Sequence, residues 1–389
     1  MQNNPAVFSQ ITATVYQSEF GRCVEAFPTL RPTRALTEYD HFLALCFGQL
    51  TYRESLRDVV ACLNSKPRLL YHLGFRGSLS RTNLAYANQH RDWRLFAAVA
   101  EVLMRRAARL YQPAPSDQDW PGLVFALDSS MIRLSLNLFP WGYWARTRQA
   151  ALKLHLLLSL KGNVPVWGAI TEPDFFDARI LDRIPIQAGA CYIMDRAYID
   201  FVRLYRIHQA GGYFVVRCKS QVSFSVRVSH PVDKKQGLRC DQTVMLKSPW
   251  SKKSFPALLR RVRVYNAEHK TVLILLTNNF EWDAEVIGDL YRQRWQVELF
   301  FKWIKQHLRI RGFYGRSQNA VRCQVWSAIC AYLMVAIVKK HIGADKSLYE
   351  ILQIVSVNAF EQVPLVELLA KSASGADAIE TQNTLMLNY

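Results

Sequence analysis

The chain has 389 residues, half of them apolar, and a formal net charge of +18. A chain of this length is too long for one ordinary domain and is apolar enough to form packed cores, which excludes an intrinsically disordered protein. Its eight cysteines include no Cys-x-x-Cys pair, so the sequence favours reduced thiols over a disulfide framework or a zinc site.

Residues 1–111 are predicted to form a helical N-terminal region. Apolar residues recur at helical spacing in segments 39–49, 52–63 and 94–110. Segment 77–87 resembles the turn and second helix of a helix-turn-helix unit, with Ser80 as N-cap and Arg81 and Asn83 early in the helix, where groove contacts occur. An ordinary helical bundle explains the same segment equally well. A proline-containing linker, residues 112–121, follows.

Residues 122–217 are predicted to form a mixed α/β sheet. Short apolar runs at 122–128, 152–160 and 164–170 indicate three strands with short connections. A strand at 190–195, a helix at 198–209 and a strand at 213–217 follow. Consecutive strands followed by alternating helix and strand indicate one mixed sheet.

Residues 218–278 are predicted to be a basic, β-rich insertion. Extended segments lie at 223–228, 242–246, 261–265 and 271–277. Residues 217–270 carry 13 Lys and Arg against 3 Asp and Glu, more than half of the chain's net charge. Such concentrated charge favours a polyanionic partner, and nucleic acid is preferred to a membrane surface because the segment contains no basic amphipathic helix.

The rest of the chain is predicted to be helical. Residues 279–340 contain helices at 283–308 and 321–340, and a C-terminal tail at 341–389 is helical to about residue 369. The longest mostly apolar stretch, 325–338, is shorter than the roughly 20 residues of a membrane span, so we expect a buried helix and no membrane partner.

Two aspartates follow buried strands. Asp128 ends the run at 122–128 and Asp195 ends the run at 190–195, so carboxylates on neighbouring strands can share a divalent cation. An aspartate after an apolar run more often only begins a turn. Asp174 and Asp177 lie between the two and are less favoured as ligands, and His155 is expected to be a packed sheet residue.

The helix at 283–308 carries a polar stripe beside its apolar one. Offsets of three, four and seven residues place five side chains on one face: Tyr291, Arg294, Glu298, Lys302 and Lys305. A solvated charged face would account for the charges but not for the tyrosine aligned with them. Packing of this helix on the sheet would bring Glu298 towards the two aspartates.

The spacing Tyr291-x2-Arg294-x3-Glu298-x6-Lys305 is similar to the Tyr-Arg-Glu-Lys signature of insertion-sequence DDE transposases of the fourth numbered bacterial family. Asp128 with two following serines, and Asp195-Arg-Ala-Tyr, also resemble that family's aspartate motifs. The resemblance covers about residues 120–340. It implies a ribonuclease-H-like fold with a β-rich insertion between the second aspartate and the glutamate, and it extends loosely to a DNA-binding N-terminal region.

The resemblance also implies a reaction. Asp128, Asp195 and Glu298 would be the catalytic, metal-binding carboxylates for two Mg²⁺ ions, with Mn²⁺ as a substitute, in cleavage and transfer of DNA strands. Tyr291, Arg294 and Lys305 would contact phosphates at the transposon end, and Lys302 joins them by helical periodicity. The expected partners are double-stranded DNA, as transposon ends and target, and a second copy of the chain in a synaptic homodimer, in the bacterial cytoplasm at the nucleoid.

Some expectations stay open. Trp250 and Trp282 are candidates for the tryptophan that stacks on a flipped base in related transposases, and neither is assigned. The alternatives in function are a ribonuclease-H-like nuclease without joining activity and a non-catalytic DNA-binding protein derived from a transposase.

Overall fold

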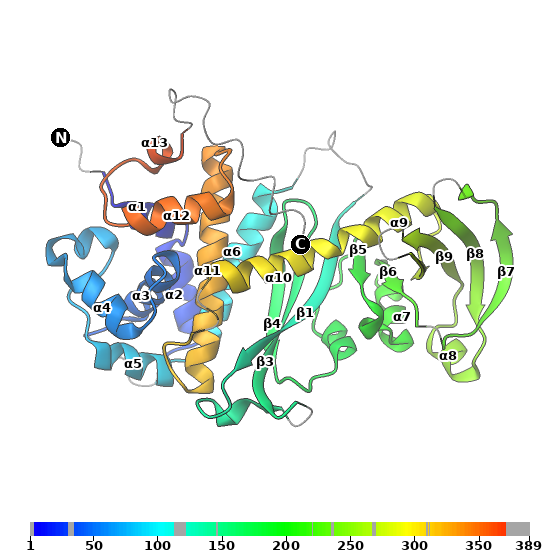
Figure 1. Ribbon diagram of the computed structural model, residues 1–389, viewed down its shortest axis with the longest axis horizontal. Coiled ribbons are helices and arrows are strands. Elements are labelled where there is room, and N and C mark those ends of the chain that lie inside the picture. The colour runs from blue at the N-terminus through cyan, green and yellow to red at the C-terminus, as the bar shows by residue number, and fades with distance from the viewer. Residues whose placement is uncertain are drawn as a thin grey trace.

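The computed structural model describes residues 4–29, 35–112, 122–144, 147–219, 221–234, 237–266, 270–308, 310 and 312–370. Most of the predicted linker, residues 113–121, and residues 371–389 of the tail lie outside this set. The described chain forms a helical body at one end and a long sheet that runs away from it, crossed on one face by two helices (Figure 1).

Two of the N-terminal helices begin at residues whose side chains accept from a free backbone N–H group. Thr37 and Asp40 form a capping box at one helix, and Ser55 caps the next. Ser80 stands at the predicted N-cap position, but its side chain makes no capping hydrogen bond. The helices are α1 (Val7–Thr12), α2 (Gln17–Ala26), α3 (Glu38–Leu50), α4 (Leu56–Asn64), α5 (Arg81–His90) and α6 (Arg94–Leu110), with 3-10 turns η1 (Pro67–Leu69) and η2 (Tyr71–Leu73) before α5.

The strands form one ten-stranded mixed sheet in the order β2-β3-β1-β5-β6-β10-β9-β8-β7, with β4 paired to β3. Strand β1 is antiparallel to β3 and parallel to β5, and β5 is parallel to β6. This confirms the predicted mixed sheet. Its strands are β1 (Val124–Leu134), β2 (Tyr143–Trp144), β3 (Gln149–Ser159), β4 (Val164–Thr171), β5 (Cys191–Met194), β6 (Tyr213–Arg217), β7 (Phe224–His230), β8 (Leu238–Leu246), β9 (Leu259–Asn266) and β10 (Thr271–Thr277).

The basic segment extends this sheet. Strand β10 pairs with β6, and β9, β8 and β7 follow outward as antiparallel neighbours. Within it, the Arg260 guanidinium forms a buried ion pair with Asp241 at 2.8 Å, which links β9 to β8. A short helix, α8 (Pro249–Ser254), connects these two strands.

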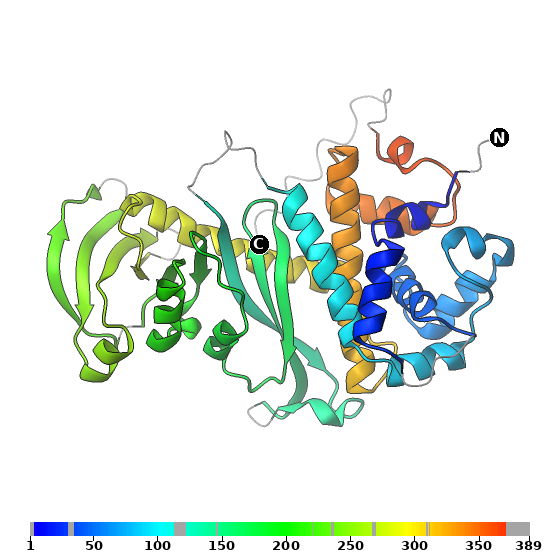
Figure 2. The ribbon, with the colours of Figure 1, turned by 180° about the vertical axis from the view of Figure 1, so that it is seen from behind.

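Helices cover both faces of the sheet. Helix α7 (Phe201–Gln209) and the 3-10 turns η5 (Asp177–Asp182) and η6 (Arg196–Tyr198) pack on one face. The opposite face is crossed by α9 (Ala284–Gln293) and α10 (Trp295–His307) (Figure 1). Seen from behind, α6 lies beside β4 and joins the sheet to the helical body (Figure 2).

The single helix predicted at 283–308 is two helices that meet at Arg294. The Arg294 N–H donates to the Tyr291 carbonyl, and the Arg294 carbonyl accepts from the Val297 N–H. Both bonds are 3.2 Å long and join residues three apart in the sequence. These tighter turns interrupt the regular ladder. The apolar stripe is nevertheless buried as predicted, with α9 packed in one core cluster and α10 in another.

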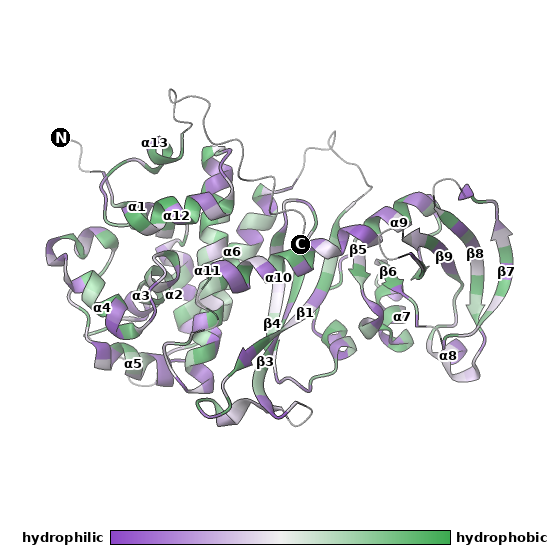
Figure 3. Ribbon diagram, viewed as in Figure 1, coloured by the Kyte–Doolittle hydropathy of each residue, from purple (hydrophilic) through white to green (hydrophobic). Residues whose placement is uncertain are grey.

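Helix α11 (Gln318–Ile342) is the centre of the helical body. It packs against α6 and α3, and α12 (Leu348–Asn358) packs against it (Figure 1). It is long and apolar enough to cross a membrane, yet 94% of its most apolar window is buried inside the protein, which confirms the predicted buried helix. Apolar residues run along its whole length (Figure 3). A last short helix, α13 (Leu365–Leu369), completes the body.

Candidate active site

Asp128 and Asp195 lie side by side at the point in the sheet where β5 ends and β1 continues. The parallel pairing of β1 with β5 ends at the pair Leu127–Met194, so the next residue on each strand is one of the aspartates. Strand β5 stops there, but β1 does not: it continues to Leu134, paired with β3. The expectation that Asp128 ends its strand was therefore wrong, because the antiparallel neighbour supports β1 for six further residues.

The surroundings of Asp128 make its negative charge costly. The pKa of this carboxyl is raised from 3.8 to about 7, chiefly by burial, and the nearby carboxylates of Asp195 and Glu298 act in the same direction. The Ser129 N–H, 2.8 Å from Asp128 Oδ1, and the Arg294 guanidinium act in the opposite direction. A carboxyl group of this kind at a sheet edge is typical of functional sites.

Arg294 bridges two of the predicted acids. Its guanidinium lies 2.5 Å from Glu298 Oε1 and 3.4 Å from Asp128 Oδ2, and 17% of its side chain is exposed. The Tyr291 ring lies beside it, 5.8 Å from centroid to guanidinium carbon, and is almost fully buried. Burial raises the pKa of the Tyr291 hydroxyl, so the ring supports the guanidinium as a neutral group.

The two lysines of the stripe differ in their surroundings. Lys305 is half-buried and its ammonium donates a hydrogen bond of 2.6 Å to Ser130 Oγ on β1. Lys302 is exposed and makes no hydrogen bond or ion pair with the described residues. Ser130 was not predicted as part of the site, although the two-residue alternation of a strand places it on the same face as Asp128.

The other face of β1 carries a polar cluster that the sequence analysis missed. Ser129 Oγ donates to Asp177 Oδ1 at 2.8 Å, and the Lys153 ammonium lies 3.4 Å from the same oxygen. His155 and Tyr198 border the cluster; both are fully buried, and burial raises the pKa of Tyr198 well above 10. His155 bonds Thr171 across the sheet at 2.9 Å, as expected of a packed sheet residue.

The donors present suit a hard divalent cation, although they are not arranged around one. Carboxylate oxygens are the ligands that Mg²⁺ prefers, and three carboxylates near one arginine leave an excess of negative charge. Within the described chain, however, no three His, Cys, Asp or Glu side chains are grouped to hold a metal ion. Arg294 instead occupies the position between Asp128 and Glu298.

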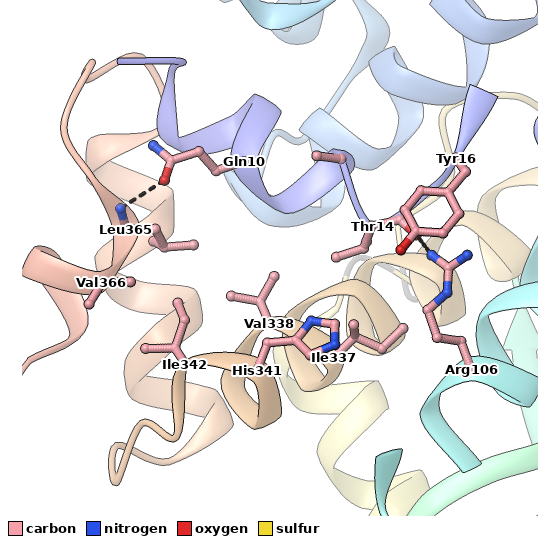
Figure 4. Close-up of a pocket in the computed structure, with 11 residues that line it drawn as sticks. Gln10, Thr14, Tyr16, Arg106, Ile337, Val338, His341, Ile342, Leu365 and Val366 are labelled. Carbon is pink, nitrogen blue, oxygen red and sulfur yellow. Dashed lines mark hydrogen bonds between the residues drawn. The ribbon is translucent and has the colours of Figure 1, made fainter. Parts of the chain in front are cut away.

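Two other features lie outside this site. Trp282 is 9% exposed and packs on Tyr213, whereas Trp250 on α8 is 68% exposed. A cavity of about 290 Å³ in the helical body is lined by α1, α6, α11 and α13, with Arg106 and His341 at its border (Figure 4). No predicted site residue lines it.

The chain is similar to several known proteins. A family model described as a transposase DDE domain matches residues 119–334, which is more than half of the chain, and one described as a domain of unknown function matches residues 3–76.

A protein of Sinorhizobium fredii named as a transposase is 34% identical over 258 residues, 65% of this chain and 70% of that protein. One of Geobacillus stearothermophilus, named as the transposase of an insertion sequence element, is 28% identical over 56% of each chain. A chain of the piggyBac transposase synaptic complex with hairpin DNA aligns with 94% of this chain and 78% of its own, at 10% identity and a TM-score of 0.45.

Proposed function

Because this chain belongs to the family defined by the transposase DDE domain, we propose that it binds the ends of an insertion sequence, cleaves the DNA there and joins the cut ends to a target. The support within the site is the pairing of β1 with β5, which ends immediately before Asp128 and Asp195. The effect of Glu298 on the pKa of Asp128 supports its membership of the same group.

DDE transposases generally use divalent metal ions, and we propose Mg²⁺, as two ions, with Mn²⁺ as a substitute. Asp128, Asp195 and Glu298 would hold them. Two such ions stabilise the attacking and leaving oxygens of a phosphodiester displacement. In holding a metal ion, Glu298 would give up its ion pair with Arg294, and the Arg294 guanidinium would then be available for a phosphate of the DNA.

The remaining residues of the stripe would hold the DNA end. Arg294, Lys302 and Lys305 supply positive charge along one helix face, and Tyr291 buttresses Arg294. A second copy of the chain would complete a synaptic homodimer around double-stranded DNA, in the bacterial cytoplasm.

The N-terminal helices are proposed to add a second DNA contact. Residues 59–91 carry five Lys or Arg and no Asp or Glu. Tyr71 is 82% exposed there and Tyr86 is 45% exposed. Exposed aromatic and cationic side chains in an acid-free segment are typical of nucleic-acid surfaces.

The test uses DNA fragments that carry the ends of the element, with Mg²⁺. We expect Asp128→Ala, Asp195→Ala and Glu298→Ala each to abolish cleavage and to leave metal-free binding of the ends intact. Cleavage retained by one of the three would remove that residue from the site. Pre-cut ends with free 3′-hydroxyls and a target plasmid separate the alternatives: joined products exclude a nuclease that only cuts, and wild-type protein that binds ends without ever cleaving them indicates a DNA-binding protein.

A further inference from the structure

We propose that Asp177 is a positioning residue, which acts through Ser129 to fix the carboxylate of Asp128 for metal binding. This inference rests on the proposed role of Asp128 as a metal ligand. Asp177 lies on η5, at the opposite face of the sheet from α10, and does not itself touch Asp128.

Ser129 connects the two acids through two different atoms. Its backbone N–H donates to Asp128 Oδ1 at 2.8 Å, and its hydroxyl donates to Asp177 Oδ1 at 2.8 Å. A change in the orientation of this residue therefore changes both contacts at once. The side chains of Asp128 and Ser129 point to opposite faces, because successive residues of a strand alternate.

The hydrogen bond from Ser129 to Asp177 matters because β1 loses one of its two neighbouring strands at this point. Up to Leu127 it is hydrogen-bonded to β5 on one side and β3 on the other. From Asp128 onward, in the described chain, only β3 pairs with it. The Ser129–Asp177 bond adds a contact on one face of β1, next to β3, just after the pairing with β5 ends.

Asp177 is itself held in place. Lys153 lies 3.4 Å from the same carboxylate oxygen that accepts from Ser129, and its ammonium also donates to the Phe175 carbonyl at 2.8 Å. The ring nitrogen Nδ1 of His155 lies 3.9 Å from this oxygen. The Lys153 ammonium thus fixes the Asp177 carboxylate, and the buried His155 ring lies beside it. The carboxylate in turn orients the Ser129 hydroxyl, which donates to it.

The test compares Asp177→Ala, which removes the acceptor of the Ser129 hydrogen bond, with Asp174→Ala. Asp174 is exposed and lies three residues earlier, so the control removes the same charge from the same loop. Mn²⁺ is titrated into the DNA-free protein by calorimetry, and the Mg²⁺ concentration for half-maximal cleavage is measured separately. Partners of a metal ligand are commonly worth 10–100-fold in metal affinity. We therefore expect Asp177→Ala to bind Mn²⁺ at least about tenfold more weakly and to need correspondingly more Mg²⁺, with Asp174→Ala unchanged.

A second variant protects the test against misfolding. Ser129→Ala removes the connecting hydroxyl and leaves the charged cluster of Asp177 and Lys153 in place. It should weaken Mn²⁺ binding as Asp177→Ala does, and the double variant should be no worse than either, because both act through one bond. Mn²⁺ affinity equal to that of wild type in folded Asp177→Ala or Ser129→Ala would overturn the proposal. If wild type binds Mn²⁺ but cleaves no DNA, the proposed function fails while the Mn²⁺ comparison still decides the role of Asp177.

Discussion

Replacement of Asp128 by asparagine should stabilise the metal-free protein at alkaline pH while abolishing cleavage. The folded state holds this carboxyl with a pKa of about 7 against 3.8 for an unperturbed group. Its side chain is only 18% exposed, so the cost of ionising it is little screened by water. Asparagine keeps an oxygen that can accept from the Ser129 N–H and carries no charge.

The size of the effect follows from the pKa difference. A rise from 3.8 to about 7 is roughly three units, and each unit corresponds to about 1.4 kcal/mol. A raised pKa means that the folded state binds the proton more tightly. The stability that the protonated carboxyl confers is therefore complete below pH 3.8 and is lost as pH rises to about 7. Relative to wild type, Asp128→Asn should gain about 4 kcal/mol in free energy of unfolding at pH 8, about 2 at pH 5 and almost none at pH 3.

Urea and thermal unfolding in EDTA at these three pH values measure the gain, with Asp174→Asn as the exposed control. Added Mg²⁺ should stabilise wild type at pH 8 and leave Asp128→Asn unchanged, because a ligand stabilises only the state that binds it. A gain that does not depend on pH, or a variant less stable than wild type at pH 8, would refute the assigned burial of this charge.

Further predictions concern the helix face and the cores. Lys302→Ala should weaken binding to DNA ends and reduce the salt dependence of log K by about one, measured by fluorescence anisotropy over a salt series, with unfolding unchanged. Arg260→Ala should cost about 3–5 kcal/mol in urea unfolding because it leaves Asp241 buried without a partner, and Arg260→Met with Asp241→Leu should recover most of the loss. Trp282→Ala should cost about 3–5 kcal/mol, whereas Trp250→Ala should change stability by less than about 0.5 kcal/mol; similar losses in both would contradict their different burial.

Most elements of the fold could be predicted because local patterns determine them. The helix at Arg94–Leu110 and the strands at Tyr213–Arg217 and Thr271–Thr277 have the predicted bounds. The length of β1 and the break at Arg294 could not be predicted in this way. The first depends on pairing with β3, whose partner residues lie 16 to 28 positions further along the chain. The second depends on which of two separate cores each half of the helix joins.

The residues of the candidate site likewise divide into those that local sequence spacing predicts and those that it does not. Helical periodicity brings Arg294, Glu298 and Lys305 to one face, and strand alternation could have added Ser130. Asp177 carries no such signal, since its contact with Ser129 spans 48 residues and depends on the path of a loop. Local sequence spacing therefore predicts the helix side of the site and leaves the residues on the far side of the sheet undetected.

The helical body has a consequence for the order in which the protein can be made. Helices α3 and α6 bury their apolar faces against α11, which follows both of them by more than two hundred residues. While the chain is being synthesised, these faces stay uncovered until α11 has left the ribosome, a period in which exposed apolar surface invites aggregation or chaperone binding. For the same reason, a fragment limited to residues 3–76 would lack the surfaces that complete its core. The segment matched as a domain of unknown function is, in this chain, one part of a core closed by the other end of the protein.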